Sequence, residues 1–410
     1  MGMLALNRLM SLRRDRQRRR LQIRARCGLI TSSRGKRKGS PCQDDGIPRD
    51  GKIMRSPIPD LPEEILFHIH SLMPMREAAR AACVSRAFLH SWRCHPNLIF
   101  NKDTIGLKIN GHGENFHHKI GRILRKHSGI SLKTFTLDYS RMCGYDGSRY
   151  YDRWVQIALK PGIEKLTLWL PATKKIYNFP SSVLSDGVRN SLQYLKLRSV
   201  ALHPTVELAP LRSLTSLHFS KVTISWDELE CLLCNSLALE QLEIISCAEI
   251  ACLKVPSSLK RLSSLTVFSC YRLKLIESKA PNLSSLSLRG HRLNFPCMET
   301  FQVKKLTMTY SNFIGDARGK LPSSMPNLET LVITSLSEVV DAPTLPTKFL
   351  YLKHLTIIKL HSPVSRPYDC FSLVSFLDAS PSLETFVLDV SQPHMLYQSV
   401  FDDSQLRHMP

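Results

Sequence analysis

The sequence predicts an α/β protein in which a small N-terminal unit of three helices precedes a solenoid with a curved parallel sheet. Two observations support this prediction. Residues 59–93 carry aliphatic and aromatic side chains at helical spacing. The longer part of the chain that follows repeats one pattern of aliphatic residues eleven times.

Composition sets broad limits on the class of protein. The 410 residues leave room for two or three domains, and 43% hydrophobic with 22% charged residues is ordinary for a globular protein. The 12 cysteines lack the paired spacing of a secreted disulfide framework, which favours a reducing compartment, nuclear and/or cytoplasmic. Because no run of 18 or more apolar residues occurs, no membrane partner is expected.

A strongly basic leader and linker occupies residues 1–57. It holds 16 Lys and Arg against 4 acidic residues, a net charge of +12 out of +22 for the whole chain. The cations form two clusters, Arg13–Arg20 and Arg34–Lys38. Such clusters bind nuclear import receptors, nucleic acid or anionic surfaces, whereas the plainer interpretation is a solvated, disordered leader. Both interpretations stay open.

Residues 58–95 are predicted to form three short helices. Aliphatic residues from Leu61 to Leu72 line one face of the first helix, and Pro74 ends it. An alanine-rich segment, Arg76–Cys83, suits a closely packed second helix, and a third carries Val84, Phe88 and Trp92 four residues apart. So small a unit cannot bury all of its apolar surface, and part of this face needs a partner.

This stretch resembles an F-box of the plant type, the module through which substrate receptors of cullin-type ubiquitin ligases bind a Skp-family adaptor. The resemblance rests on the order and spacing of its apolar residues and on the segment Val84 to Trp92. It implies a set of adaptor-binding residues: Leu61, Pro62, Ile65, Leu66, Ile69, Leu72, Pro74, Val84, Phe88 and Trp92.

A transitional region, 96–130, precedes the repeats, which span 131–395 and leave a C-terminal tail at 396–410. Each repeat has the pattern LxxLxL, as in Leu192-Gln-Tyr-Leu195-Lys-Leu197. The patterns start at Leu132, Ile163, Leu192, Leu214, Leu239, Leu262, Leu283, Val303, Leu328, Leu352 and Leu383. Most steps between them fall in the range of about 20–29 residues that is typical of leucine-rich repeats.

The repeat pattern explains the predicted architecture. Alternation at the second and third aliphatic residues predicts a short strand with one buried face, and stacked repeats bury these faces in a parallel sheet. Cys247 and Cys270 stand at the ninth repeat position, which contacts the turn backbone. The whole resembles the plant F-box receptors with leucine-rich repeats. Little sequence follows the last repeat to cap the solenoid, so we expect a truncated end or a partner there.

Strand alternation also predicts which side chains point outward on the concave side. Exposed aromatic residues and arginines often anchor protein interfaces, which makes these positions candidates for binding a target protein. The alternative, that they are ordinary surface positions, stays open. The candidates are Trp169, Tyr194, Lys196, Arg198, His218, Glu243, Phe268, Arg289 and Lys305.

The sequence contains no recognisable set of catalytic, metal-binding or cofactor-binding residues, so we expect no enzyme, metal or cofactor. Cys231 and Cys234 form a CxxC pair without a second pair at zinc-site spacing, and we expect them to pack in the core. His117 and His118 precede a basic run and suggest a solvated surface.

Two functional hypotheses follow. In the first, the chain is a non-catalytic substrate receptor of a Skp-cullin-F-box ubiquitin ligase, with the adaptor, a cullin and an unidentified target protein as partners. No membrane is expected as a partner, and nucleic acid is not favoured. In the second, the chain is a leucine-rich-repeat scaffold whose basic tail binds nucleic acid or a nuclear partner independently of ubiquitin.

Overall fold

A computed structural model describes most of the chain after residue 60. The chain divides into two units, Met1–Pro59 and Asp60–Pro410, and every described residue lies in the second. The described residues are 61–84, 86–106, 113–129, 132–140, 147–173, 175–204, 210–290, 302–335, 338, 341–360 and 370–391. The basic leader and the C-terminal tail therefore lie outside the described residues.

Three short helices begin the described part: α2 (Glu63–Leu72), α3 (Met75–Ala81) and α4 (Arg86–Arg93). A proline in extended conformation stands directly before each of the first two. The carbonyl of Pro62 accepts from the N–H groups of Ile65 and Leu66, at 3.0 and 3.1 Å. Since proline has no N–H to lose and a fixed φ, it starts a helix without breaking its hydrogen bonds.

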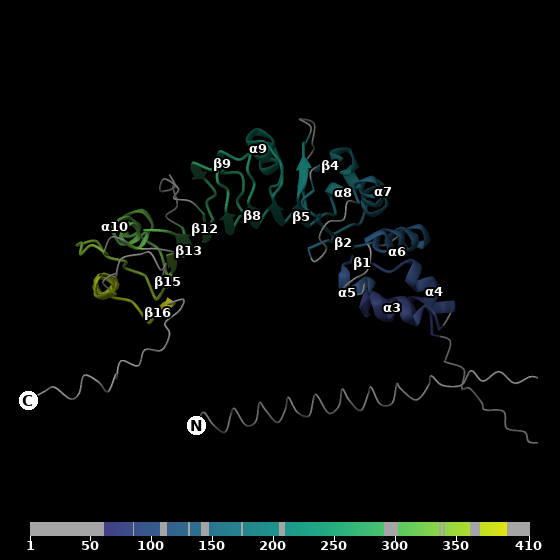
Figure 1. Cartoon of the computed structure of the whole chain (residues 1–410), viewed down its shortest axis with the longest axis horizontal. Coiled ribbons are helices and arrows are strands. Elements are labelled where there is room, and N and C mark those ends of the chain that lie inside the picture. Colours follow the sequence, from purple (N-terminus) through teal and green to yellow (C-terminus); the bar gives the residue numbers. More distant parts are fainter. Residues whose placement is uncertain are drawn as a thin grey trace, which may run out of the picture. The chain divides into compact units, whose positions relative to one another are not determined.

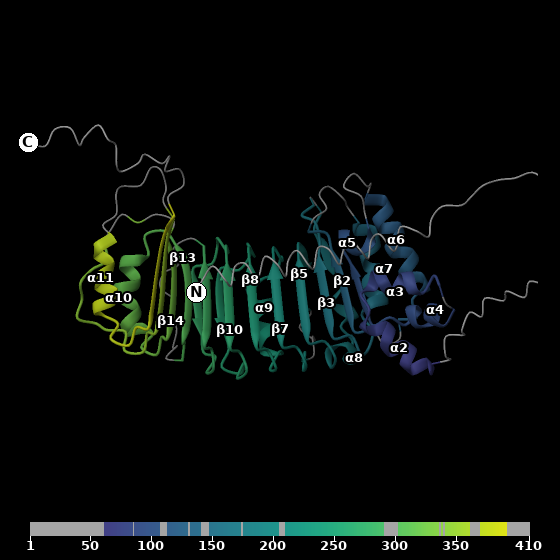
Figure 2. The ribbon, with the colours of Figure 1, turned by 90° about the horizontal axis from the view of Figure 1, so that it is seen from below.

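The helices are followed by a long parallel sheet, whose strands line the inner side of a curve (Figure 1; Figure 2). Twelve strands of the described residues pair in the order β1-β2-β3-β5-β7-β8-β10-β12-β13-β14-β15-β16. Their bounds are β1 Asn97–Phe100, β2 Thr134–Asp138, β3 Lys165–Trp169, β5 Tyr194–Arg198, β7 Ser216–Ser220, β8 Gln241–Ile245, β10 Ser264–Phe268, β12 Ser285–Arg289, β13 Lys305–Tyr310, β14 Thr330–Ser335, β15 His354–Leu360 and β16 Thr385–Ser391. The predicted solenoid with a curved parallel sheet is confirmed.

Helices and two small sheets form the outer layer of the curve (Figure 1). The helices on this side are α6 Gly113–Lys126, α7 Ser148–Ala158, α8 Asp186–Arg189, α9 Trp226–Cys234, α10 Ile314–Ser324 and α11 Val374–Asp378, with short 3-10 turns at Ser181–Val183 and Cys370–Leu373. The short helix α5 (Lys102–Ile105) follows β1 and contacts it and α3. The small sheets pair β4 (Tyr177–Phe179) with β6 (Val200–Leu202) and β9 (Cys252–Val255) with β11 (Leu275–Ser278).

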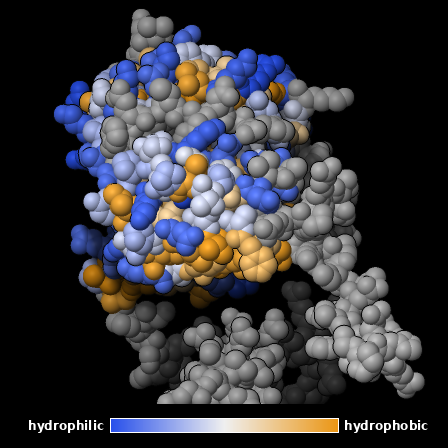
Figure 3. All heavy atoms as spheres, turned by 90° about the vertical axis from the view of Figure 1, so that its left-hand side faces the viewer, coloured by the Kyte–Doolittle hydropathy of each residue, from blue (hydrophilic) through white to orange (hydrophobic). Residues whose placement is uncertain are grey.

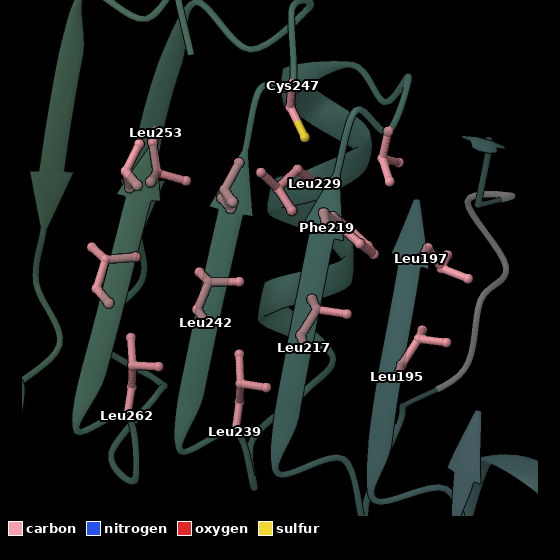
Figure 4. Packing of buried hydrophobic residues seen from close by; sticks show 14 of the residues in the cluster. Leu195, Leu197, Leu217, Phe219, Leu229, Leu239, Leu242, Cys247, Leu253 and Leu262 are labelled. Carbon is pink, nitrogen blue, oxygen red and sulfur yellow. The ribbon is translucent and has the colours of Figure 1, made fainter. Parts of the chain in front are cut away.

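The aliphatic residues of the repeat pattern form continuous rows in the core. Leu195, Leu217, Leu242 and Leu265 are cross-strand partners along β5, β7, β8 and β10, and each is almost fully buried. Figure 4 shows Leu195, Leu217 and Leu242 of this row, Leu239 and Leu262 in a second row below it, and Leu229 of α9 packed against the sheet. Burial of each such side chain stabilises the fold by about 1.5–3 kcal/mol.

The sheet begins earlier than the repeat pattern predicts. Strand β1 lies in the predicted transitional region and pairs in register with β2, so that Leu98 and Phe100 extend the buried rows. In this first repeat, His95 occupies the position of the first aliphatic residue of the LxxLxL pattern, and His95 is also buried. Because histidine is not aliphatic, this first repeat does not match the LxxLxL pattern.

The turn after several strands has the same unusual backbone. Ser199, Lys221, Ser246 and Ser269 directly follow β5, β7, β8 and β10, and each has a φ of 51–52°. Their N–H groups donate to the carbonyl at the end of the next strand, at 2.7–3.0 Å. The left-handed backbone conformation is unfavourable for every residue type except glycine. These hydrogen bonds therefore stabilise a conformation that the residues would otherwise avoid.

The last strand leaves one edge of the sheet uncovered within the described residues. Phe386 and Leu388 on β16 are 36% and 40% exposed, whereas their cross-strand partners Leu355 and Ile357 on β15 are buried. Figure 3 views this end of the solenoid and shows hydrophobic side chains gathered along its lower edge. An edge strand with exposed apolar side chains is a surface on which another segment or chain can pair.

Two expectations about individual residues were wrong. His117 is buried, in an aromatic cluster with Phe116, Tyr139 and Trp154 of neighbouring elements, because its side of α6 faces α7 and the sheet. Cys234 is exposed and Cys231 half-buried, because Leu229, Leu232 and Leu233 form the buried side of α9. Cys247, in contrast, is buried after β8, with its Sγ 3.5 Å from the Ile245 carbonyl.

Candidate functional site

The first candidate surface is the apolar face of α2 and the segment before α4. Its side chains are aliphatic and yet 37–87% exposed: Leu61, Ile65, Ile69, Leu72 and Val84. On α2 the residues recur every three or four positions, which places them on one face of the helix. Pro62 and Pro74 are exposed at the two ends of this face. Because a contiguous exposed apolar surface is unfavourable in water, this face is suited to bind a protein partner.

The other three predicted adaptor-binding residues are only half-exposed, because they also pack within the chain. Phe88 stacks on His70 with ring centroids 5.4 Å apart, and Trp92 lies 5.7 Å from His95. Leu66 is half-buried on α2. The structure therefore divides the predicted set into seven exposed residues and three that join the apolar face to the interior.

A buried histidine, which the sequence analysis did not identify, ties the helices together. The Nε2 of His70 lies 2.9 Å from the carbonyl oxygen of Ala78, which links α2 to α3. Burial lowers the pKa of His70, against the hydrogen bonds to the Ala78 and Ser91 backbone, which raise it. Leu89 on α4 is a further exposed aliphatic residue outside the predicted set, although it adjoins the stripe of Phe88 and Trp92.

The second candidate surface is the strand face on the inner side of the curve. Its strongest feature is Trp169 at the end of β3, with two cations over its ring. Lys196 Nζ and Arg198 Cζ on β5 lie 4.8 and 4.5 Å from the ring centroid. Trp169 and Arg198 are direct cross-strand partners. These cation–π contacts hold two positive charges beside a large aromatic surface.

A second group of side chains on this face contains an acidic residue. Tyr194 lies 4.9 Å from His218 between ring centroids, and the Nδ1 of His218 contacts the carboxylate of Glu243. The pKa of Tyr194 is raised, mainly by burial and further by the negative charge of Glu243. The three side chains lie on the neighbouring strands β5, β7 and β8, and each contacts the next across the inner strand face.

A third group lies farther along the sheet. The guanidinium of Arg289 on β12 stacks over Phe268 on β10, with Cζ 4.6 Å from the ring centroid. Lys305 is exposed at the start of β13. Three strand spacings, or about 14 Å, separate β5 from β10. The nine predicted residues thus all lie on the inner strands, but they form separate groups instead of one site.

Among the described residues, no three His, Cys, Asp or Glu side chains are grouped so that they could hold a metal ion. No helix in the described part of the chain has the length and apolar character needed to cross a membrane.

Two family models match the chain. The F-box domain model matches residues 58–100, and the model described as the At1g61320/AtMIF1 LRR domain matches residues 123–410. The first match covers the exposed helix face, and the second covers the sheet from the end of α6 onward.

The chain is also similar to curated proteins of Arabidopsis thaliana. Three F-box/LRR-repeat proteins are 24%, 25% and 28% identical over 62%, 80% and 73% of this chain. The aligned part spans 52%, 63% and 66% of those relatives, which is less than two thirds of their length. With the second family model covering well over half of its residues, the chain belongs to the family defined by the At1g61320/AtMIF1 leucine-rich-repeat domain and carries an F-box before it.

Proposed function

We propose that this chain is a non-catalytic substrate-receptor subunit of a Skp-cullin-F-box ubiquitin ligase, acting in the nucleus or cytoplasm. The exposed aliphatic face on α2 carries the proposal, because it lies inside the segment that matches the F-box model. Aliphatic side chains at this exposure are available to a partner without any rearrangement of the fold.

The α2 face supplies part of the free energy of docking. Full burial of a large aliphatic side chain contributes about 1.5–3 kcal/mol. Only the fraction of the side chain that is exposed in the free chain counts toward this gain. Leu61, Ile65, Ile69 and Leu72 together thus offer a gross gain on the order of 5 kcal/mol, to which α4 adds. Losses of translational freedom and side-chain entropy reduce the net affinity.

The inner strand face is proposed to hold the target protein. Aromatic rings flanked by cations, as at Trp169 and Phe268, offer apolar contact area with charged groups at its border. The chain then acts by proximity: binding raises the effective concentration of target lysines near a conjugating enzyme, with no chemical step in this chain.

The proposal is tested by adaptor pull-down with two matched double variants. Leu61→Ala with Ile65→Ala removes aliphatic groups from the α2 face, and we expect binding of a recombinant Skp-family adaptor to fall at least tenfold. The control, Ile176→Ala with Leu237→Ala, removes the same groups from comparably exposed positions of the solenoid and should bind normally.

Circular dichroism should give the same melting curve for all three proteins, since every substituted side chain is exposed. Undiminished adaptor binding by the Leu61 and Ile65 double variant would show that the α2 face is not the docking surface. Failure of the unaltered chain to bind any Skp-family adaptor would contradict the proposed function itself.

A further inference from the structure

A hollow of about 280 Å³ lies where the three-helix unit meets the first turn of the solenoid. Its apolar wall comes from four separate elements: Met75 and Ala79 of α3, Trp92 of α4, Ile105 of α5 and Ile123 of α6. Trp92 contributes here as well as to the predicted adaptor-binding set. The hollow is thus a surface of the junction itself and is separate from the inner strand face.

Four cations surround this apolar wall. Lys119, Arg122 and Lys126 stand at positions i, i+3 and i+7 of α6, so they lie on one face of the helix, and Arg76 comes from α3. The Nζ of Lys119 donates to the carbonyl oxygen of Ile105 at 3.3 Å. No carboxylate of the described residues forms an ion pair with any of the four. A local excess of positive charge is left at the rim.

We propose that this hollow binds an acidic segment of a partner protein, with one aliphatic or aromatic side chain inserted against Trp92 and acidic residues paired with the rim. The volume is at the lower end for a ligand pocket and suits a single large side chain. Carboxylates on both sides of that anchor would meet guanidinium and ammonium groups, which form their strongest hydrogen bonds with charged acceptors.

The composition of the hollow argues against other occupants. A small polyphosphate would pair with the cations but would leave the apolar wall of Met75, Trp92 and Ile123 exposed to water. The chain's own leader, residues 1–57, has a net charge of +12 and would be repelled by the rim. An acidic peptide with an apolar anchor matches both the charge and the wall.

The test uses the full chain and a short fluorescein-labelled peptide in which one phenylalanine is flanked by glutamates on both sides. Binding is followed by fluorescence anisotropy at low ionic strength. We expect Arg122→Glu to weaken binding at least tenfold, because it reverses a charge at the rim. Arg125→Glu is the matched control: it makes the same charge change on the same helix, at a residue outside the lining of the hollow, and should bind within twofold of the unaltered chain.

A second probe tests the apolar anchor. Replacing the phenylalanine of the peptide by alanine should weaken binding at least tenfold, and raising the salt concentration should weaken both peptides. The proposal does not depend on adaptor binding, so it can fail while the proposed function stands.

Several results would overturn the proposal. They are no peptide binding at low salt, equal binding of the phenylalanine and alanine peptides, or equal losses for Arg122→Glu and Arg125→Glu. If tripolyphosphate displaced the labelled peptide at a lower concentration than the same unlabelled peptide does, the hollow would be a phosphate site instead. If Arg198→Glu abolished peptide binding while Arg122→Glu left it unchanged, the peptide would bind on the inner strand face.

Discussion

At the scale of single residues, the turn after several strands restricts which side chain can occupy it. Ser269 follows β10 with a φ of 51°, and its N–H donates to the Arg289 carbonyl at 2.7 Å. A β-branched side chain is poorly tolerated in this left-handed region, whereas glycine adopts it freely. The hydrogen bond therefore stabilises the left-handed backbone conformation, and the side chain has only to be compatible with that conformation.

We predict that Ser269→Val lowers the free energy of unfolding by about 1–2 kcal/mol, in line with the cost of a left-handed L-residue. Ser269→Gly keeps the N–H and relieves the strain, while it gives the unfolded chain more freedom, so its effect should be close to zero or slightly stabilising. Chemical denaturation of the three proteins measures the difference. Equal stability of the valine and glycine variants would contradict the role of the backbone conformation.

The residues of the inner strand face show how far sequence alone reaches. Alternation along a strand indicated that Trp169, Arg198 and Phe268 leave the core, and each is indeed only half-buried and follows a buried residue. Alternation could not predict that Arg198 would lie over Trp169, because their strands are 29 residues apart in the repeat pattern and the register depends on the whole turn between them. Contacts between repeats are therefore found only in the structure.

At the scale of elements, a set of histidines joins the three-helix unit to the solenoid. The Nε2 of His95 lies 3.3 Å from the Met73 carbonyl, and its own carbonyl is 2.9 Å from Nε2 of His127 on the segment after α6. The ring of His70 packs against His95 with centroids 5.9 Å apart. This junction cannot be predicted from the sequence patterns, because histidine is neither a repeat residue nor part of an apolar stripe.

This junction should weaken in mild acid. Burial is the main cause that lowers the pKa of His70, His95 and His127, and nearby positive charge, including Lys160 beside His127, lowers some of them further. In the unfolded chain histidine titrates near pH 6.5. Above that pH these groups are neutral in both states, and their contribution to stability is complete. Below it the unfolded chain binds protons that the folded chain excludes, so the free energy of unfolding falls as pH falls.

We predict that the melting temperature is constant from about pH 8 to pH 7 and declines below about pH 6.5. His95→Leu, which installs the aliphatic residue of the repeat pattern, should reduce the slope of that decline. Thermal denaturation of both proteins over this pH range is the measurement. A slope that is the same with and without His95 would assign the acid sensitivity to other groups.

At the scale of the whole molecule, the sequence predicts the solenoid because one short pattern recurs eleven times and no single repeat buries its own strand. It misses the first turn, where His95 takes an aliphatic position, and it cannot show which helix covers which strand. The spacing of the apolar residues predicts the exposed α2 face. The division between exposed Leu72 and half-buried Trp92, in contrast, depends on how α4 packs against α2, α3 and His95.

Stability in such an array should be local along the chain. Leu265 of β10 is fully buried and has Leu242 and Leu286 as its cross-strand partners. We predict that Leu265→Ala costs about 2–5 kcal/mol, from lost burial and the cavity left behind. Because each repeat contacts mainly its neighbours, the loss should appear in β8, β10 and β12 and fade toward the ends of the sheet.

Hydrogen–deuterium exchange resolved along the chain measures this distribution. Thr266→Ala serves as the control, since it alters the next residue of the same strand on the side that faces away from the core. It should leave exchange in all strands nearly unchanged. In the Leu265→Ala protein, faster exchange confined to the central strands indicates nearest-neighbour coupling, and β2 at the start of the sheet should stay protected. Uniform loss of protection from β2 to β15 would instead mean that the solenoid unfolds as one cooperative unit.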